Sequence, residues 1–303
     1  MARRSGGGCH TFGGCHSRSG VPDARMGRET LNFHLFLWLK MNELVSFVNL
    51  VINGLMMGSL YALMTLGLTL LFGVMGVINV AHVDLIILSA YIVYWMFHLY
   101  GLSPFLSFIV TVPIMFVIGV LLEKILIEPL QKRTRSHGEF VRMTLPVFFG
   151  VAMVFRHSMT SLWTGDYRAI TTYLTGKAFT FAQIRVSILR LACLVGSVSI
   201  VGLIFLYLTK TKTGKQIRAL SQNAVAAKIV GINVERIRLI SFAIGISTAG
   251  FAGYLFSFIY TFFPGAAGEW VPLLFCIMVT GGLGCAEGTL VVGIIFGLLD
   301  SVV

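Results

Sequence analysis

Asn79, His82 and Asp84 are the first candidates for chemistry, because they interrupt a long apolar stretch of the sequence. A polar or ionisable side chain within a membrane segment costs free energy and is therefore a functional candidate by default. Asn79 and His82 are three residues apart and would lie on one side of a helix. We interpret the three residues as the lining of a pathway or a gate. The alternative is a turn at the membrane interface after Gly73 and Gly76, where polar side chains cost little.

Two more polar residues, Asn53 and Tyr61, lie eight residues apart in the preceding apolar stretch, on roughly one helical face. They are also candidates for a polar path, although a buried Asn often serves only as a hydrogen-bonding contact between helices. Arg156 interrupts a third apolar stretch and must face protein, water or the membrane interface. A carboxylate such as Glu123 is a candidate partner for its charge.

The segment 214–233 is rich in small residues and is flanked by basic residues. We predict one helix here, in which Ala219, Asn223, Ala226 and Val230 share a face. Such a face is too weakly apolar to bury itself in a core, yet flat enough to dock into a groove of another protein. Gly231 stands where a helix needs a left-handed residue at its C-terminal end. A short docking helix of this type is what a pump needs when its motor is a separate protein.

The sequence lacks the motifs of the common catalytic and nucleotide-binding sites. It contains no Gly-x-x-x-x-Gly-Lys-[Ser/Thr], no His-Glu-x-x-His and no Gly-x-Ser-x-Gly. The pairs Cys9-His10 and Cys15-His16 have ligand chemistry for a metal, but their short glycine-rich segment offers nothing to fix a coordination geometry. We therefore expect no catalysis, no cofactor and no bound metal.

These residues are set in a strongly apolar chain. Hydrophobic residues make up 56% of the sequence and charged residues only 12%, about half the charged share of soluble domains. Apolar stretches long enough to cross about 30 Å of hydrocarbon recur along the chain. We predict an all-α, polytopic membrane protein with about seven or eight transmembrane helices, some of them broken or re-entrant. The predicted spans are 44–73, 77–98, 104–127, 143–163, 188–209, 237–262 and 271–299.

The first and the last of these spans are long enough to contain a break. We expect the run Gly281-Gly282-Leu283-Gly284 to interrupt the last one. Broken helices are a recurrent way to build transport sites, because the freed backbone groups can line a cavity.

The formal net charge of +11 does not point to nucleic acid. No Lys or Arg occurs between residues 40 and 124, so the chain offers no basic face to a phosphate backbone. The positive residues instead gather in two loops, 132–142 and 210–238, which the positive-inside rule places in the cytoplasm. The loops 164–187 and 263–270 are then external.

Residues 1–40 differ from the rest of the sequence. Gly and Ser dominate the start of the chain, and hydrophobicity begins only near Leu31. We expect a poorly structured N-terminal extension that arises from translation upstream of the functional start, Met41. The transmembrane domain is predicted to occupy 41–303.

Three stretches together carry a resemblance to a known family. The first contains the motifs Asn53-Gly54, Gly58-Ser59-Leu60-Tyr61 and Asn79-Val80-Ala81-His82. This stretch resembles the start of the branched-chain amino acid permeases of ATP-binding-cassette importers. The segment 214–233 resembles the cytoplasmic loop of that family, and 281–289 resembles its late glycine turn. The three stretches occur in the family's order and cover most of residues 45–303.

The chain departs from the family pattern at three places. Val83-Asp84 stand where the family usually continues with Gly-Glu, and Cys285-Ala286-Glu287 stand where small residues and a proline are more usual. The chain stops at Val303, so the resemblance implies a copy truncated before the family's last span and basic tail.

The resemblance implies a permease subunit of an ABC importer in the bacterial cytoplasmic (inner) membrane, taking up branched-chain or related hydrophobic amino acids. Its partners would be a second permease subunit, two ABC ATPase subunits that hydrolyse ATP, and a periplasmic or lipid-anchored solute-binding protein. The expected substrate pathway contains Asn53, Tyr61, Asn79, His82 and Asp84. The expected ATPase-coupling residues are Arg218, Ala219, Asn223, Ala226 and Gly231.

Three alternatives remain open on the sequence. A permease of the same family for urea or short amides would share every motif. A stand-alone secondary transporter or channel would use Asn79, His82 and Asp84 as an ion or proton site. An integral membrane enzyme would use His82 and Asp84 in catalysis.

Overall fold

The computed structural model describes residues 24–181 and 184–302. The chain divides into two compact units, Met1–Val45 and Ser46–Val303. The described part of the first unit, residues 24–45, is helical and belongs to the first helix. The pairs Cys9-His10 and Cys15-His16 lie outside the described residues. All further description concerns the second unit.

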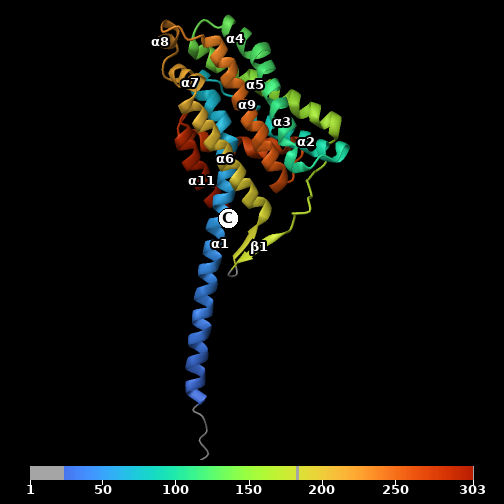
Figure 1. Ribbon diagram of the computed structural model, residues 1–303, viewed down its shortest axis with the longest axis vertical. Coiled ribbons are helices and arrows are strands. Elements are labelled where there is room, and N and C mark those ends of the chain that lie inside the picture. Colours follow the sequence, from blue (N-terminus) through green and yellow to red (C-terminus); the bar gives the residue numbers. More distant parts are fainter. Residues whose placement is uncertain (1–23, 182–183, 303) are drawn as a thin grey trace, which may run out of the picture. The chain divides into compact units, whose positions relative to one another are not determined.

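The second unit is a bundle of helices, as the sequence predicted (Figure 1). The long helices are α1 (Ala24–Met75, here from Ser46), α2 (His82–Tyr100), α3 (Phe108–Leu122), α5 (His137–Trp163), α6 (Ile188–Lys210), α9 (Val234–Ile259), α10 (Ala267–Gly281) and α11 (Ala286–Val302). The short elements are η1 (Pro104–Leu106), the π-turn η2 (Glu123–Ile127), α4 (Glu128–Arg133), α7 (Lys212–Gln222), α8 (Ala224–Ile229) and η3 (Pro264–Ala266). Strands β1 (Ala178–Phe181) and β2 (Ile184–Ser187) form an antiparallel hairpin.

Seven described helices are long and apolar enough to cross a membrane. They run from Glu43 to Met75, His82 to Tyr100, Pro104 to Arg133, His137 to Trp163, Ile188 to Lys210, Val234 to Ile259 and Pro264 to Gly281. The predicted all-α, polytopic class is therefore confirmed. The last predicted span, 271–299, is broken as expected: α10 ends at Gly281 and α11 begins at Ala286. The first span, in contrast, is one continuous helix.

Two helices, α1 and α9, form the centre of the bundle. Every residue of α1 from 56 to 69 is buried, and most of α9 beyond Ser241 is buried as well. The outward faces of α3, α5 and α6 instead carry exposed large hydrophobic residues, as expected for surfaces in contact with lipid. The central pair thus positions whatever polar groups lie inside the membrane.

Close helix packing depends on glycine where α1 meets α11. A Cβ atom on Gly58 would lie 2.6 Å from the Cα of Ile294, nearer than side-chain atoms ever approach backbone. Glycines spaced by four residues let helix backbones approach in lipid, where dispersion contacts drive association. At the α10–α11 break, Gly282 and Gly284 have φ values of +96° and +84°, which favour glycine.

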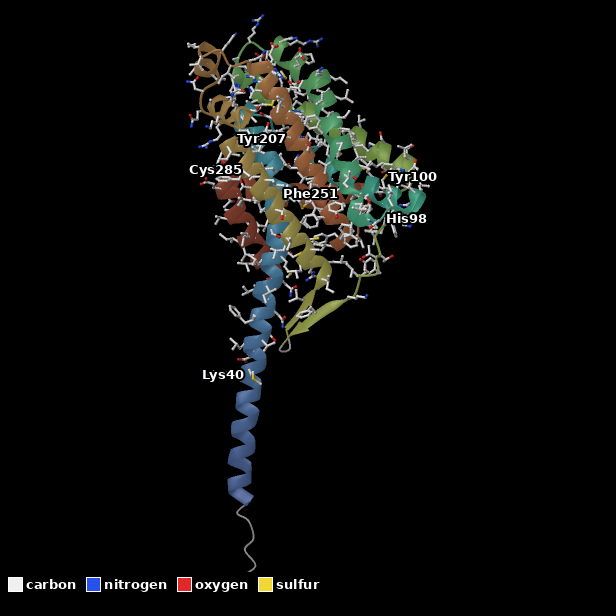
Figure 2. The ribbon with its side chains drawn as sticks, viewed as in Figure 1. Lys40, His98, Tyr100, Tyr207, Phe251 and Cys285 are labelled. Atoms are coloured by element: carbon white, nitrogen blue, oxygen red, sulfur yellow. The ribbon has the colours of Figure 1, made fainter. Side chains whose placement is uncertain are left out.

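The two basic loops lie at the same end of the bundle. The elements α4, α7 and α8 gather there, and the hairpin β1–β2 lies toward the other end (Figure 1). His98 and Tyr100, at the close of α2, lie away from α7 and α8 (Figure 2). This arrangement agrees with the prediction that both basic loops lie on one side of the membrane and the loop 164–187 on the other.

The predicted single helix over 214–233 is wrong. Helix α7 ends at Gln222, and Asn223 has an extended backbone with φ of −158°. The Oδ1 atom of Asn223 accepts hydrogen bonds from the backbone N–H groups of Val225 and Ala226, both at 3.0 Å. An Asn side chain that bonds the backbone in this way starts a new helix instead of continuing the old one. The prediction that Gly231 is left-handed is confirmed, with φ of +82°.

Candidate functional site

The chain turns back into the bundle between α1 and α2. Helix α1 ends at Met75, and Gly76, with φ of +69°, redirects the chain. The Nε2 atom of His82, the first residue of α2, lies 3.1 Å from the carbonyl oxygen of Met64. Met64 precedes Met75 by about 16 Å of helix. The residues 76–81 return the chain over this distance, and the last of them form a turn in which the His82 N–H bonds the Asn79 carbonyl. Helix α2 therefore begins well inside the bundle.

The start of α2 carries a group that we call the inner polar cluster: Asn79, His82 and Asp84. All three side chains are fully buried. Neither amide atom of Asn79 has a hydrogen-bond partner within the described chain, and the same holds for Nδ1 of His82 and Oδ2 of Asp84. Buried polar atoms without partners are rare, since each costs about 1–3 kcal/mol. This concentration of unbonded polar atoms therefore calls for a role other than stability.

Glycine in α1 makes room for the inner polar cluster. A Cβ atom on Gly67 would lie 2.8 Å from Cε1 of His82, and it would also meet Thr248 of α9. Both central helices thus approach the imidazole ring closely. The sequence located Gly67 but gave no sign of this contact, because its two sides come from separate helices.

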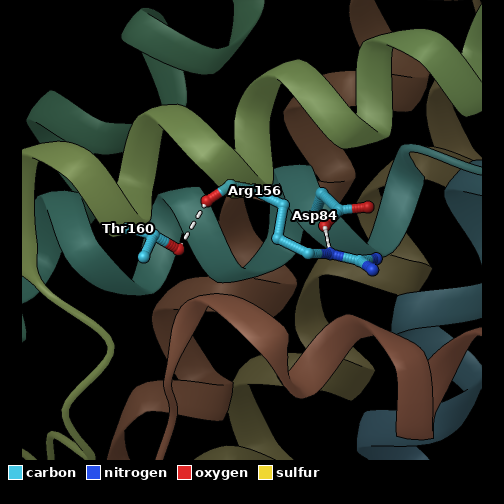
Figure 3. A network of polar contacts seen from close by, with 3 residues as sticks. All are labelled: Asp84, Arg156 and Thr160. Carbon is cyan, nitrogen blue, oxygen red and sulfur yellow. Dashed lines mark hydrogen bonds and ion pairs between the residues drawn. The ribbon is translucent and has the colours of Figure 1, made fainter.

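Arg156 of α5 reaches the inner polar cluster and pairs with Asp84. Its Nε lies 3.3 Å from Oδ1 of Asp84, and its side chain is 35% exposed (Figure 3). Thr160, one turn later, donates a hydrogen bond to the Arg156 carbonyl at 2.9 Å. The suggested partner Glu123 is therefore wrong. The carboxylate in the first turn of α2 is stabilised both by this ion pair and by the positive end of the helix dipole.

Asn79 and His82 do not share a helical side, which corrects the prediction from their spacing. Asn79 precedes α2 and lies in the connecting segment, where its carbonyl accepts a bond from the His82 N–H at 3.2 Å. The alternative of an interfacial turn is also wrong in one respect. The segment is a turn, but the Asn79 side chain is fully buried rather than at an interface.

A second group, the outer polar cluster, consists of Tyr61, Tyr260, Trp270 and Asp300. The Tyr61 hydroxyl donates a hydrogen bond to Oδ2 of Asp300 at 2.8 Å and lies 2.9 Å from the Tyr260 hydroxyl. The Trp270 ring meets the Tyr61 and Tyr260 rings edge-on, with centroid separations of 5.8 and 4.8 Å. These groups satisfy one another.

Asn53, the other predicted pathway residue in α1, has different partners from Tyr61. Its Oδ1 accepts a hydrogen bond from Nη1 of Arg190 at 3.0 Å, and its Nδ2 donates to the Asn49 carbonyl at 2.8 Å. This is the interhelical contact that the sequence offered as the alternative. Reasoning from the sequence missed Arg190, Tyr260 and Asp300. A charged residue within an apolar terminal segment, Asp300, was the one available signal.

The segment α7–α8 presents the predicted coupling residues. Arg218, Asn223, Ala226 and Gly231 are exposed, and Ala219 is half-buried. A stronger feature is the exposure of the apolar side chains of α8 and its end, of which the sequence pattern singled out Val230 alone. Val225, Ile229 and Val230 are 72%, 80% and 75% exposed. Large apolar side chains so fully exposed on a polar loop are uncommon and form an apolar patch on this end of the bundle.

Comparison with known proteins assigns the chain to a family. Residues 50–303 match the family described as the permease component of a branched-chain amino acid transport system. No solved structure matches the chain. The matched family is a transport component and not an enzyme.

Three curated relatives illustrate the match. The branched-chain amino acid transport permease protein LivH of Methanocaldococcus jannaschii is 29% identical, over 83% of this chain and 79% of the relative. The high-affinity permease protein BraD of Pseudomonas aeruginosa is 23% identical, over 86% and 87%. The high-affinity LivH of Escherichia coli K12 is 22% identical, over 86% of each.

Proposed function

The chain belongs to the branched-chain amino acid transport permease family, and from this premise we propose a specific role. It is the permease subunit of an ABC importer that carries branched-chain or related hydrophobic amino acids across the cytoplasmic membrane. ATP is hydrolysed by partner subunits, because this chain carries no phosphate-binding loop. Residues 41–303 form the transmembrane domain, and the family match from residue 50 supports that boundary.

The observation that carries this proposal is the buried start of α2. Asn79, His82 and Asp84 lie inside the bundle with four polar side-chain atoms unbonded in the described chain. A permease needs polar groups along its path that a passing solute or water can bond and then release. Helices that begin within the membrane supply such groups without exposing backbone to lipid. The inner polar cluster is accordingly the proposed place on the pathway where the passing solute is bonded and released.

The outer polar cluster and Asn53 border the external part of the same pathway, where side chains bonded to one another and to neighbouring helices shape its wall. Tyr260 follows the end of α9 opposite the basic loops, and the Tyr61 hydroxyl is held between Tyr260 and Asp300. Aromatic rings and a carboxylate suit the passage of an amino acid, whose ammonium group prefers such surroundings. Solute arrives there from a periplasmic or lipid-anchored binding protein.

The segment α7–α8 couples the bundle to two ATPase subunits. Exposed Val225, Ile229 and Val230 offer an apolar anchor that fits a groove on a soluble partner. Arg218 and Asn223 add a polar rim, and Ala226 adds a small, flat part of the contact face. A second permease subunit completes the membrane part, and the assembly resides in the bacterial inner membrane.

Reconstituted uptake tests the proposal. The chain, a second permease, the ATPases and a binding protein are placed in liposomes, and entry of labelled leucine is followed with and without ATP. We expect uptake only with ATP and with a binding protein, whose preference sets the choice between leucine and solutes such as urea or short amides. Uptake by the chain alone, without ATPases, would contradict the proposal.

A bulky substitution on α8 tests the coupling surface. Ala226→Trp adds volume to the exposed face and should lower ATP-driven uptake, because overpacking a contact typically costs about 1–3 kcal/mol. Ser199→Trp, on the apolar helix α6, is the matched control for the added ring. Unchanged ATPase co-purification and unchanged uptake in Ala226→Trp would remove α8 from the interface.

A further inference from the structure

A large cavity opens on the side of the molecule that carries α4 and α8. Its volume is about 960 Å³, which is within the range of small-molecule sites. One wall comes from η2 and α4, and the other comes from α8 and the first turns of α9. None of its lining residues belongs to the inner or the outer polar cluster.

A buried carboxylate without a partner lines this cavity. Glu123 is only 5% exposed, and it takes part in no ion pair or hydrogen bond of its side chain within the described chain. It begins the π-turn η2, in which the Glu128 N–H bonds the Glu123 carbonyl five residues back. Pro129 follows and has no N–H, so the regular helical ladder is interrupted at this point. Such π-turns occur frequently at functional sites.

A guanidinium group lines the same cavity. Arg238 projects from the second turn of α9, and its Nε is buried without a hydrogen-bond partner among the described residues. Its neighbours Glu128 and Lys132 pair with each other at 2.5 Å and so leave Arg238 and Glu123 uncommitted. Lys228, Glu235 and Arg236 also line the cavity but are exposed to solvent. Glu123 and Arg238 are thus the less exposed charged groups of the lining outside the Glu128–Lys132 pair, and within the described chain they do not form an ion pair with each other.

Part of the remaining wall is aliphatic. Ile232, Val234 and Leu239 line the cavity beside the two charged groups. A simple anion would be repelled by Glu123, and a simple cation would be repelled by Arg238. A ligand that carries both charges and an apolar side chain satisfies all three features. A carboxylate suits the fork of a guanidinium, and an ammonium group suits a buried carboxylate.

We propose that this cavity is a second solute site, which binds a free amino acid with an aliphatic side chain from the cytoplasmic side. Glu123 binds its ammonium group, and Arg238 binds its carboxylate. Because α8 forms one wall, the bound amino acid links the coupling segment to α4 and α9. If the chain imports amino acids, as proposed above, the accumulated product would then restrain α8 and slow further import.

Binding to the full chain in nanodiscs tests the site without any transport. Saturation-transfer NMR would compare leucine with isocaproate, which lacks the ammonium group, and with isoamylamine, which lacks the carboxylate. We expect leucine to bind with a Kd of about 1 mM, and each analogue about tenfold more weakly or not at all. If isocaproate binds as tightly as leucine, the site recognises only an anion, such as a lipid phosphate, and the proposal is overturned. Failure of leucine to bind would also overturn it.

Substitutions locate the bound leucine. Glu123→Gln and Arg238→Gln should each weaken leucine binding about tenfold, whereas Glu128→Gln, at the same cavity, should leave it unchanged. Asn79→Leu should also leave it unchanged, because the inner polar cluster is a different site. Loss of binding in Asn79→Leu together with full binding in Glu123→Gln would assign the leucine to the pathway and overturn the proposal.

Uptake into leucine-loaded liposomes tests the consequence. The initial rate in the complete assembly should fall as the leucine concentration on the cytoplasmic side rises, and Glu123→Gln should abolish this dependence while keeping the basal rate. If the initial rate of Glu123→Gln falls with cytoplasmic leucine as steeply as the rate of the wild type, the regulatory role is contradicted. Absence of any ATP-driven uptake would count against the proposed function instead, which separates the two failures.

Discussion

The inner and outer polar clusters both lie among membrane-spanning helices, but their polar groups are satisfied to different extents. In the outer cluster, the Tyr61 hydroxyl bonds Asp300 and lies within hydrogen-bond distance of Tyr260. In the inner cluster, Asn79 makes no side-chain hydrogen bond in the described chain, and Asp84 uses only one of its two oxygens. The polar groups of the outer cluster are hydrogen-bonded to one another, whereas several polar atoms of the inner cluster have no partner in the described chain.

This difference separates polar groups that hold the bundle together from polar groups available to a solute. A satisfied network rigidifies its surroundings, whereas an unsatisfied one destabilises the fold unless another molecule bonds it. Substitutions should therefore act in opposite ways. In the outer cluster they should lower stability. In the inner cluster the neutral side chain, Asn79, limits stability while serving transport, so that replacing it with an apolar side chain should raise stability.

The ion pair of the inner cluster should give the largest effect. Arg156→Met leaves the buried Asp84 carboxylate without its counter-charge, which should lower the free energy of unfolding in detergent by about 3–5 kcal/mol. Arg142→Met, an exposed change on the same helix, is the control. Adding Asp84→Asn to Arg156→Met should restore most of the loss, and a double variant as unstable as the single one would refute the electrostatic explanation.

In the outer cluster, the loss of one hydrogen bond should have a smaller effect, which is measured as a loss of stability. Tyr61→Phe removes the hydroxyl that bonds Asp300, so thermal unfolding should report a loss of about 1 kcal/mol. Tyr91→Phe is the matched control, because the Tyr91 hydroxyl is buried without a hydrogen bond in the described chain. The control should be neutral or stabilising. Equal losses in both variants would show that the hydrogen bonds of Tyr61 contribute nothing specific.

The contact between Asn53 and Arg190 should give the smallest effect. Asn53→Ala should cost about 0.5–1 kcal/mol, because the contact is half-buried and its members keep access to water. The double variant Asn53→Ala/Arg190→Ala should be no less stable than the more damaging single variant. Fully additive losses in this double-mutant cycle would mean that the two residues do not interact energetically.

Features set by local sequence were predictable, and contacts between distant segments were not. The spans and the break at Gly281–Gly284 follow from apolar length and glycine content, and both are present. Asp84 and Arg156 are 72 residues apart, and Tyr61 and Asp300 are 239 apart. No periodicity in a single sequence can pair such residues, so Glu123 was chosen wrongly as the partner of Arg156.

The helix over 214–233 failed for a local reason. Small residues and regular spacing favoured one helix, but the Asn223 side chain competes for backbone N–H groups and separates α7 from α8. An Asn followed by alanines is compatible with one continuous helix and also with two separate short helices. The exposed apolar residues Val225 and Ile229 then became visible only after the two short helices were placed.

The measurement that tests the difference between the two clusters most directly is made on Asn79→Leu. The substitution replaces an unbonded buried amide with an apolar side chain of similar size. We predict that the free energy of unfolding rises by about 1 kcal/mol or more, because the desolvation cost of the amide disappears. ATP-driven leucine uptake by the same variant should fall at least about tenfold, since function and stability oppose each other at such sites. A variant that is less stable than the wild type, or that transports normally, would contradict the account.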